Sequence, residues 1–393
     1  MTAGVGGLLL ALASMDVAHA ADVVAWGPSR RANPAGHRHR QHHATTAIHR
    51  DGPVVVVWDE AGPVKSIKAR VFGLDLSPVG DVVDVGRCIN PEPCRPDVVA
   101  TAGGFFVVWS NARGVSMRRI GVDGSLMGDP IVVVEAADGA TPEAPDLAAT
   151  PDGLMVAWTT SDRSGGDETS AYSVRAYDNR GMPLTEPSRF SAFSDMGGTL
   201  DIATVDSDHV LALYSTYDAG DGTVEAKVMS AELELDGMLV RERPVSVGSG
   251  MRLSRPMVDT REGLIATTYV AELGYEGPKQ AYVQLLTTDG RVHPPVALGR
   301  SSGHPIVEIV GEAILVQWDQ RVLPEGDKQV WEAWMDLDGL LLSDPGQSEL
   351  AGVDAERPAL DARWVNGRGV AVRVWTARPA PEADPQVYLQ LGE

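Results

Sequence analysis

The chain has 393 residues, of which 44% are hydrophobic, and a formal net charge of -21. Such an acidic surface repels phosphate backbones and anionic lipids, which argues against nucleic-acid partners and electrostatic membrane docking. The ordinary hydrophobic content, with glycine and proline dispersed along the chain, predicts an ordered globular protein rather than a disordered one.

Residues 1–20 have the features of a secretory signal peptide. Gly6–Ala13 supplies a short apolar core, and Ala18–Ala20 offers the small-x-small pattern of a cleavage site. The apolar run is too short to span a bilayer. No Lys or Arg precedes it, which leaves two interpretations: an upstream start or an atypical signal. We expect a secreted or periplasmic protein without membrane insertion.

The two cysteines, Cys88 and Cys94, enclose a short segment that contains two prolines. In an oxidising compartment this spacing favours a disulfide that closes a loop. The alternative is a two-thiolate metal site, which lacks further ligands nearby.

One apolar strand that ends on an aromatic residue recurs along the rest of the chain at a spacing of about 50 residues, a period typical of repeat architectures. Its seven copies are Pro53–Trp58, Gly104–Trp109, Gly153–Trp158, His209–Tyr214, Gly263–Tyr269, Ala313–Trp318 and Gly369–Trp375. We therefore expect one repeat domain over residues 21–393.

Each repeat contains four short β-type runs separated by alternating tight turns and longer loops. In the second repeat the runs are Asp97–Ala100, Phe105–Trp109, Val115–Ile120 and Pro130–Val134. Asp-Gly pairs such as Asp123-Gly124 supply the positive φ that a two-residue hairpin turn needs. The pattern predicts an all-β fold, a seven-bladed β-propeller of four-stranded antiparallel blades.

The last repeat lacks a fourth strand, whereas the chain starts with a segment that belongs to no repeat. Residues 21–36 would form a closing strand and linker before the seven repeats of residues 37–393, with Val23–Trp26 as the spare strand. Pairing of this strand with the last blade would close the ring and remove its exposed edges.

The repeat resembles the propeller-like repeats of exported bacterial proteins. Their pattern is a Gly-apolar-apolar-Val-Trp strand, an Arg-containing third strand such as Lys68–Val71 or Met117–Ile120, and an Asp-Gly turn. The resemblance covers residues 21–393 and implies a fold but no particular function. Trp-Asp occurs only at Trp58-Asp59 and Trp318-Asp319, without the Gly-His of a WD40 repeat, and sialidase and kelch signatures are absent. No narrower family is indicated.

Binding is expected on the face that carries the variable loops between second and third strands, because such loops on a rigid scaffold commonly hold binding sites. Tyr217 and Tyr275 lie in these loops. Trp331 and Trp334 lie three residues apart on one strand and so on opposite faces, which predicts that at least one is exposed. The aromatic residues that end the second strands are expected in the core.

Six blades direct an acidic residue of the innermost strand toward the channel: Asp97, Asp146, Asp201, Asp259, Glu308 and Asp361. These acids could be solvated or hydrogen-bonded between blades. They could instead bind a polar ligand or a hard cation such as calcium. A pair could also act as general acid and base on a glycosidic bond.

A run of histidines, His37, His39, His42 and His43, precedes the first repeat. It is either a transition-metal site or a basic connection without a metal.

From these observations we expect an exported, monomeric binding or scaffold protein that recognises a glycan, a peptide or a surface protein. The alternative is a polysaccharide hydrolase or lyase with carboxylates at the mouth of the channel. The sequence does not decide whether the protein is an enzyme.

Overall fold

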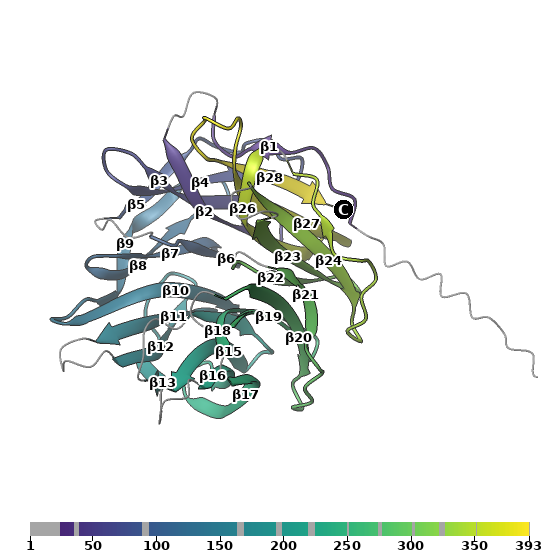
Figure 1. Ribbon diagram of the computed structural model, residues 1–393. Helices are drawn as coiled ribbons and strands as arrows, with labels where there is room; N and C mark the ends of the chain where they lie inside the picture. Colours follow the sequence, from purple (N-terminus) through teal and green to yellow (C-terminus); the bar gives the residue numbers. More distant parts are fainter. Residues whose placement is uncertain are drawn as a thin grey trace, which may run out of the picture.

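The computed structural model describes residues 24–34, 39–88, 94–162, 169–193, 199–218, 225–249, 251–273, 277–300, 303–321, 327–350 and 352–392. Every regular element in this part of the chain is a β-strand, and the strands form seven four-stranded antiparallel sheets in a ring (Figure 1). The predicted seven-bladed β-propeller is confirmed. No helix long and apolar enough to cross a membrane occurs among the described residues.

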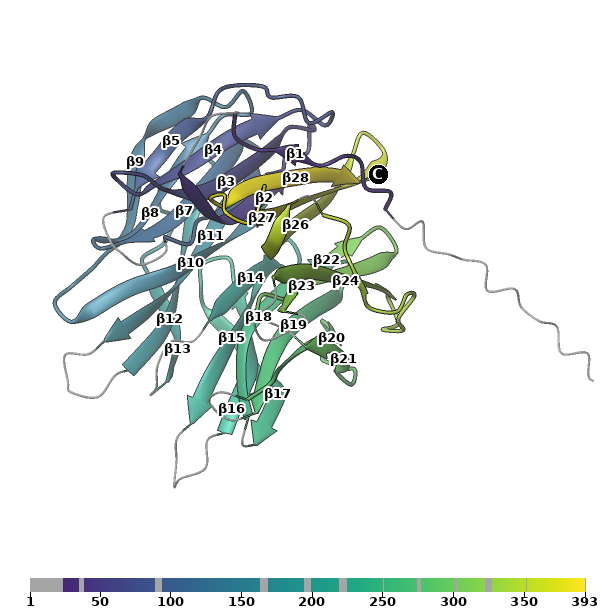
Figure 2. The same cartoon turned by 45° about the horizontal axis from the view of Figure 1, so that its top comes forward.

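The blades follow one another in chain order around the ring (Figure 2). Blade 1 contains β2 (Arg40–Ile48), β3 (Val54–Ala61), β4 (Ser66–Phe72) and β5 (Val83–Arg87). Blade 2 contains β6 (Asp97–Thr101), β7 (Gly104–Asn111), β8 (Gly114–Ile120) and β9 (Leu126–Glu135). Blade 3 contains β10 (Ala140–Thr150), β11 (Gly153–Asp162), β12 (Thr169–Asp178) and β13 (Ser188–Phe193). Blade 4 contains β14 (Leu200–Thr204), β15 (His209–Asp218), β16 (Glu225–Glu234) and β17 (Leu239–Ser249).

The remaining blades complete the ring. Blade 5 contains β18 (Met251–Arg261), β19 (Leu264–Leu273), β20 (Lys279–Thr287) and β21 (Val296–Arg300). Blade 6 contains β22 (Ile306–Val310), β23 (Ala313–Arg321), β24 (Lys328–Asp336) and β25 (Gly346–Gln347). Blade 7 contains β26 (Val353–Val365), β27 (Arg368–Arg378), β28 (Gln386–Gly392) and, from the other end of the chain, β1 (Arg30–Arg31).

The first strand of each blade lines the central channel. Because consecutive strands run antiparallel, the turns between strands one and two and between three and four share one face, which we name the turn face. The loops between strands two and three and the connections between blades lie on the opposite face, the loop face. The turn face therefore carries the turns within the blades, whereas the loop face carries the loops and the connections between blades.

The second strands are continuous apolar runs because blades pack against both of their faces. In β3 the seven residues from Val54 to Glu60 are all buried. Each aromatic residue near the end of a second strand packs toward the preceding blade; these are Trp58, Trp109, Trp158, Tyr214, Tyr269, Trp318 and Trp375. The core thus consists of layers between blades, and the prediction that these aromatic residues are core is confirmed.

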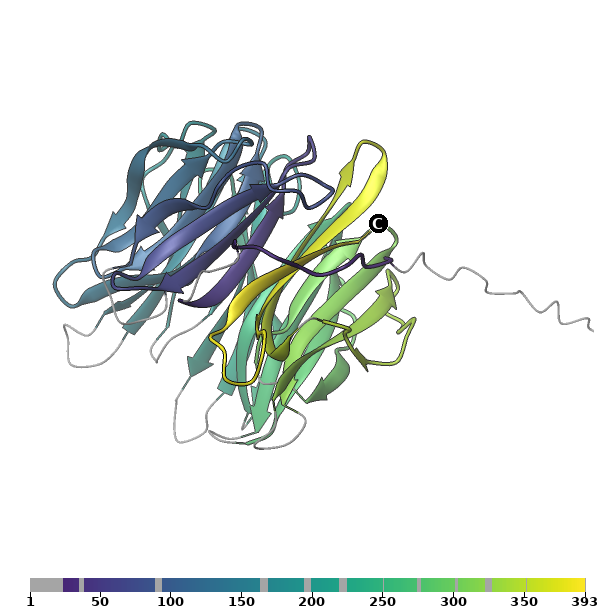
Figure 3. The same cartoon turned by 90° about the horizontal axis from the view of Figure 1, so that it is seen from above.

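The N-terminal segment completes blade 7, as predicted. Arg30 pairs with Leu389 and Arg31 with Tyr388 in an antiparallel register. Figure 3 shows this purple segment running beside the yellow C-terminal strand. Trp26, in the predicted spare strand, adds a single bridge to Gly392, and its ring packs against the guanidinium of Arg373 at 4.0 Å.

Candidate functional site

Six acidic side chains of the innermost strands lie in the channel, and all but Asp259 border a cavity of about 180 Å³. The innermost strands bring together the predicted residues Asp97, Asp146, Asp201, Asp259, Glu308 and Asp361. Asp97, Asp146 and Asp201 lie opposite the residue before the aromatic of the second strand, and the other three lie two residues farther along. We name these six side chains the carboxylate belt.

Every carboxylate of the belt accepts a hydrogen bond from the innermost strand of the next blade. The donors are Leu147 N to Asp97 (3.2 Å), Ile202 N to Asp146 (2.6 Å), Val258 N to Asp201 (2.5 Å), Ile309 N to Asp259 (2.7 Å), Ala362 N to Glu308 (3.0 Å) and Ile48 N to Asp361 (2.5 Å). Blade 1 has Thr45 in place of an acid, and its hydroxyl donates to Asp97 at 3.2 Å. The belt therefore ties all seven blades together around the axis.

The belt lies deep in the molecule, and this environment disfavours its ionisation. Asp201 is only 8% exposed, and the other five border the narrow channel. Burial raises the pKa of Asp201 to about 7 and that of Asp259 to about 6. Burial, followed by repulsion from a neighbouring carboxylate, raises the pKa values of Asp97, Asp146 and Glu308 well above their ordinary range.

The mouth of the channel on the turn face opens into a larger cavity of about 470 Å³. Arg50, Arg261, Arg363 and Trp364 line it above the belt. Trp364, the last residue but one of β26, is 63% exposed. The other tryptophans that the structure describes are buried or partly buried. Arg261 donates to the carbonyl of Gly311 at 2.8 Å, which fixes one wall.

The mouth on the loop face carries a different set of side chains. Five side chains occupy the same position at the start of the channel-lining part of the innermost strand in blades 5, 6, 7, 1 and 2: Arg255, His304, Arg357, His43 and Arg95. We name this alternating series the basic arc. Ala144 and Thr199 take the position in blades 3 and 4, so the arc spans five consecutive blades and leaves a gap with two uncharged side chains.

The backbone that presents the basic arc is strained. His43, Arg255 and Arg357 lie at β-bulges and have φ values of 48°, 54° and 53°, and Arg95 has a φ of 39°. A side chain in the left-handed region costs on the order of 1 kcal/mol or more and persists where the surroundings hold it. Bulges of this kind redirect a side chain, here at the channel mouth.

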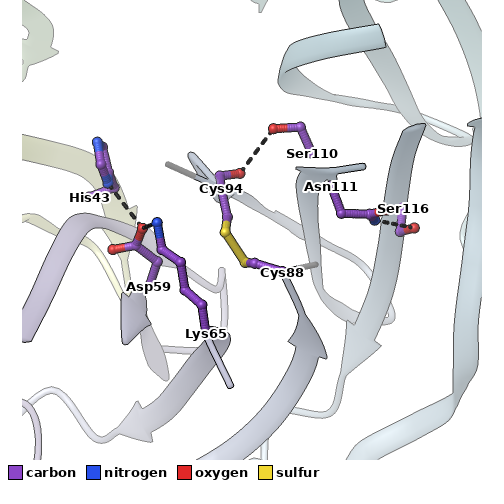
Figure 4. The surroundings of a disulfide bond; sticks show 8 residues. All are labelled: His43, Asp59, Lys65, Cys88, Cys94, Ser110, Asn111 and Ser116. Atoms are coloured by element: carbon purple, nitrogen blue, oxygen red, sulfur yellow. Dashed lines mark hydrogen bonds and ion pairs between the residues drawn. A yellow bond between two sulfur atoms is a disulfide. The ribbon is translucent and has the colours of Figure 1, made fainter. Parts of the chain in front are cut away.

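Both histidines of the arc connect an arginine to a buried aspartate. Arg357 contacts Nε2 of His43. Nδ1 of His43 lies 3.3 Å from Asp59, and Lys65 pairs with the same Asp59 oxygen at 3.2 Å (Figure 4). Because the guanidinium always donates, Nε2 must accept, so Nδ1 carries the proton and donates to Asp59.

A second arrangement of the same residue types lies around His304 in blade 6. Arg255 lies 2.6 Å from Nε2 of His304, Nδ1 of His304 lies 3.0 Å from Asp319, and Lys328 pairs with Asp319 at 3.8 Å. Burial lowers the pKa of His304, although the nearby Asp319 raises it. Burial likewise lowers the pKa of His43, although Asp59 raises it. Both histidines are therefore neutral near pH 7 and can accept from the arginines.

The predicted disulfide between Cys88 and Cys94 is present beside the first of these arrangements (Figure 4). The amide of Cys88 donates to the carbonyl of Lys65 at 2.9 Å, and the amide of Ser110 donates to the carbonyl of Cys94 at 3.1 Å. Arg95 directly follows Cys94. The crosslink therefore fixes the connection from blade 1 to blade 2 and the position of the third arginine of the arc.

The two tryptophans predicted on β24 do not join either mouth. Trp334 is buried toward blade 7 and Trp331 is partly buried toward blade 5. They lie on opposite faces as predicted, but neither is exposed, because blades cover both sides of β24. Tyr275, the side chain of Tyr217, and His37 lie outside the described residues. His39 is exposed and His42 partly buried. Among the described residues no group of three or more His, Cys, Asp or Glu side chains is arranged to hold a metal ion.

The structure thus defines a closed seven-bladed β-propeller with an acidic channel and a basic mouth. No family model and no curated protein matches the chain. A protein of unknown function from Dyadobacter fermentans DSM 18053 is similar in structure, with a TM-score of 0.55 and 10% identity over 94% of this chain and 99% of that one.

Two further solved structures are less similar. A puromycin-hydrolyzing peptidase of Mycobacterium tuberculosis has a TM-score of 0.41 at 17% identity over 88% of this chain and 60% of that chain. A sialidase of Trypanosoma rangeli, in complex with the inhibitor DANA, has a TM-score of 0.42 at 10% identity over 93% and 58% of the two chains. At such identities the likeness concerns the fold alone.

Proposed function

We propose that the protein is an exported β-propeller that binds a glycan, a peptide or a surface protein at the loop-face mouth of its channel. The observation that carries this proposal is the basic arc itself, a series of polar side chains at the start of five innermost strands on that face, three of them at bulges. The Cys88–Cys94 disulfide supports export, because structural disulfides persist in oxidising compartments.

The engagement of the carboxylate belt favours binding over hydrolysis. A glycosidase needs two carboxyl groups about 5 to 9 Å apart with a sugar between them. Each belt carboxylate instead accepts a hydrogen bond from a backbone N–H of the next blade. This includes Asp259, Glu308 and Asp361, the three that also border the larger turn-face cavity. We therefore expect no release of reducing ends from polysaccharides.

The test combines thermal melts with hydrogen exchange on the mature protein. A panel of oligosaccharides and peptides is screened first; a ligand at about a hundred times its Kd stabilises the folded state by about 2.7 kcal/mol. Exchange with the best ligand should then slow at amides of the loop-face mouth, such as those of residues 42–45 and 254–257. Trp364→Ala, at the turn-face mouth, is the matched control and should leave binding unchanged. Protection confined to the turn face, or loss of binding in Trp364→Ala, would contradict the proposal.

A further inference from the structure

The basic arc concentrates positive charge in a protein whose net charge is -21. Within the described part of the chain, the guanidinium groups of Arg95, Arg255 and Arg357 form no ion pair with a carboxylate, and Nε of Arg357 has no hydrogen-bond partner. The carboxylates of the two histidine arrangements have lysine partners: Asp59 pairs with Lys65, and Lys328 is shared between Asp319 and Glu356. The three guanidinium charges are therefore left for another partner.

The three arginines also repel one another, which shows that they share one region. Burial lowers the pKa of Arg255, and the charges of Arg95 and Arg357 lower it further, against the effect of Asp319. Arg95 and Arg357 likewise disfavour a charge on His43. Clustered cations without counterions are held at a cost, which an incoming anion would relieve.

The histidines hold the guanidinium groups in place. Each Nε2 accepts from an arginine while Nδ1 donates to an aspartate that is almost completely buried, with side-chain exposures of 1% for Asp59 and 0% for Asp319. The same four residue types, Arg, His, Asp and Lys, form this arrangement at two places in the ring. A guanidinium fixed in this way loses less freedom when it binds a planar oxyanion with two parallel hydrogen bonds.

We infer that the basic arc binds a single carboxylate or sulfate group of a small acidic ligand, with Arg255 and Arg357 as its principal contacts. This inference rests on the proposed loop-face site and names the chemistry of its ligand. A short ligand with one acidic group fits better than a polyanion, because the overall charge of the protein repels extended negative chains. Ala144 and Thr199, which complete the ring of positions, are uncharged and would face the uncharged part of the ligand.

The probes are D-glucuronate, its neutral counterpart D-glucose, N-acetylglycine and inorganic sulfate, titrated calorimetrically into the mature protein. We expect glucuronate to bind with at least tenfold higher affinity than glucose, to compete with sulfate, and to bind more weakly as NaCl is raised. N-acetylglycine separates the sources of the carboxylate: tighter binding than glucuronate would identify a peptide ligand, and weaker binding an acidic sugar. Equal affinity for glucuronate and glucose, or no binding of any anion, would overturn the inference.

Substitution then assigns the contacts. Arg255→Gln combined with Arg357→Gln should weaken glucuronate binding by roughly 10- to 100-fold, the range for lost hydrogen bonds to a charged group. Arg363→Gln, which changes an innermost-strand arginine at the opposite mouth, should leave it unchanged. If the double variant and Arg363→Gln weakened glucuronate binding equally, the anion would not be bound at the basic arc. Sulfate competition with the unsubstituted protein needs no variant, so misfolding of the double variant leaves the inference testable. Binding of neutral ligands without any anion would refute this inference but keep the proposed function.

Discussion

Asp201 and Asp59 are both buried carboxylates, yet their surroundings shift their pKa values in opposite directions. Burial raises the pKa of Asp201 to about 7, although Val258 N and Asp146 provide hydrogen bonds. Burial also opposes ionisation of Asp59, but His43 and Lys65 outweigh it and lower the pKa. Asp201 therefore favours a proton, whereas Asp59 and Asp319, behind the basic arc, remain charged.

The raised pKa of Asp201 predicts a loss of stability as pH rises. The pKa of Asp in an unfolded chain is about 3.9. Between this pH and about pH 7, Asp201 of the folded state keeps a proton that the unfolded state has lost. The resulting stabilisation is complete below about pH 4 and disappears as pH rises through 7. Asp201→Asn keeps an acceptor for Val258 N and should reduce the dependence of the unfolding free energy on pH between 5 and 7, by up to about 1.4 kcal/mol per pH unit.

The measurement is urea unfolding at a series of pH values. Asp201→Ala is the companion variant: it removes the acceptor and should cost about 1–3 kcal/mol at every pH. An unchanged pH dependence in Asp201→Asn would mean that Asp201 is not a source of the titration.

At the scale of single residues, the sequence predicted which acids enter the channel and left open whether they are solvated, hydrogen-bonded between blades or bound to a ligand. The alternation of side chains along a strand places the acids in the channel. The N–H groups that donate hydrogen bonds to them belong to another blade, which the pattern within one repeat does not show. The basic arc was missed, although a signal exists in the sequence: Trp58-Asp59 and Trp318-Asp319 are its only Trp-Asp pairs. Both belong to the blades in which histidine, His43 or His304, takes the arc position, and this coincidence marks the two blades.

Among the strands, the contact of Gly86 in β5 with Trp109 in the next blade shows how closely the blades pack. A Cβ atom added to Gly86 would lie 2.3 Å from Cζ2 of Trp109. The indole fills the space between the outer strand of blade 1 and the second strand of blade 2, so only a residue without a side chain fits there.

Gly86→Ala should therefore destabilise the protein by about 1–3 kcal/mol through overpacking. Gly346→Ala is the matched control in the outer strand of blade 6, where the nearest atom would lie 3.9 Å away. Equilibrium unfolding in urea compares the two. Similar losses in both variants would show that glycine is needed for the strand itself rather than for the contact with Trp109.

The innermost strand of the last blade passes through a proline. β26 covers Val353–Val365 and has a bulge before Ala359. A proline inside a run predicts an end of pairing, since it lacks a donor. The bulge instead accommodates Pro358, and its existence depends on the partner strand, which a local pattern does not show.

For the whole molecule, the number of blades and the closure of the ring were predictable, because repeats are read from their period and the missing strand was matched by a spare one. The extent of the closing strand was not. The regular pairing involves Arg30 and Arg31, and Trp26 contributes only a bridge, since the register is set by β28 and by the core between blades 7 and 1.

Removal of the closing segment should destabilise the entire ring. A chain that starts after Arg31 would leave the edge of β28 unpaired and expose the faces of blade 7. We expect a lower melting temperature and association through the free edge, measured by calorimetry and size-exclusion chromatography. A chain that starts at Ala21 is the control. Equal melting temperatures and equal elution of the two chains would contradict a structural role for the closure.

The joining of the two chain ends also determines the order in which this protein acquires its fold. Asn33 contacts Gln386 across 353 residues of sequence, so the contact that completes the ring is among the most distant in the chain. Contacts of such separation form slowly, because a long loop must close first. A chain that emerges N-terminus first therefore carries its closing strand without a partner until the last blade has appeared, and we expect ring completion to be the final step of folding.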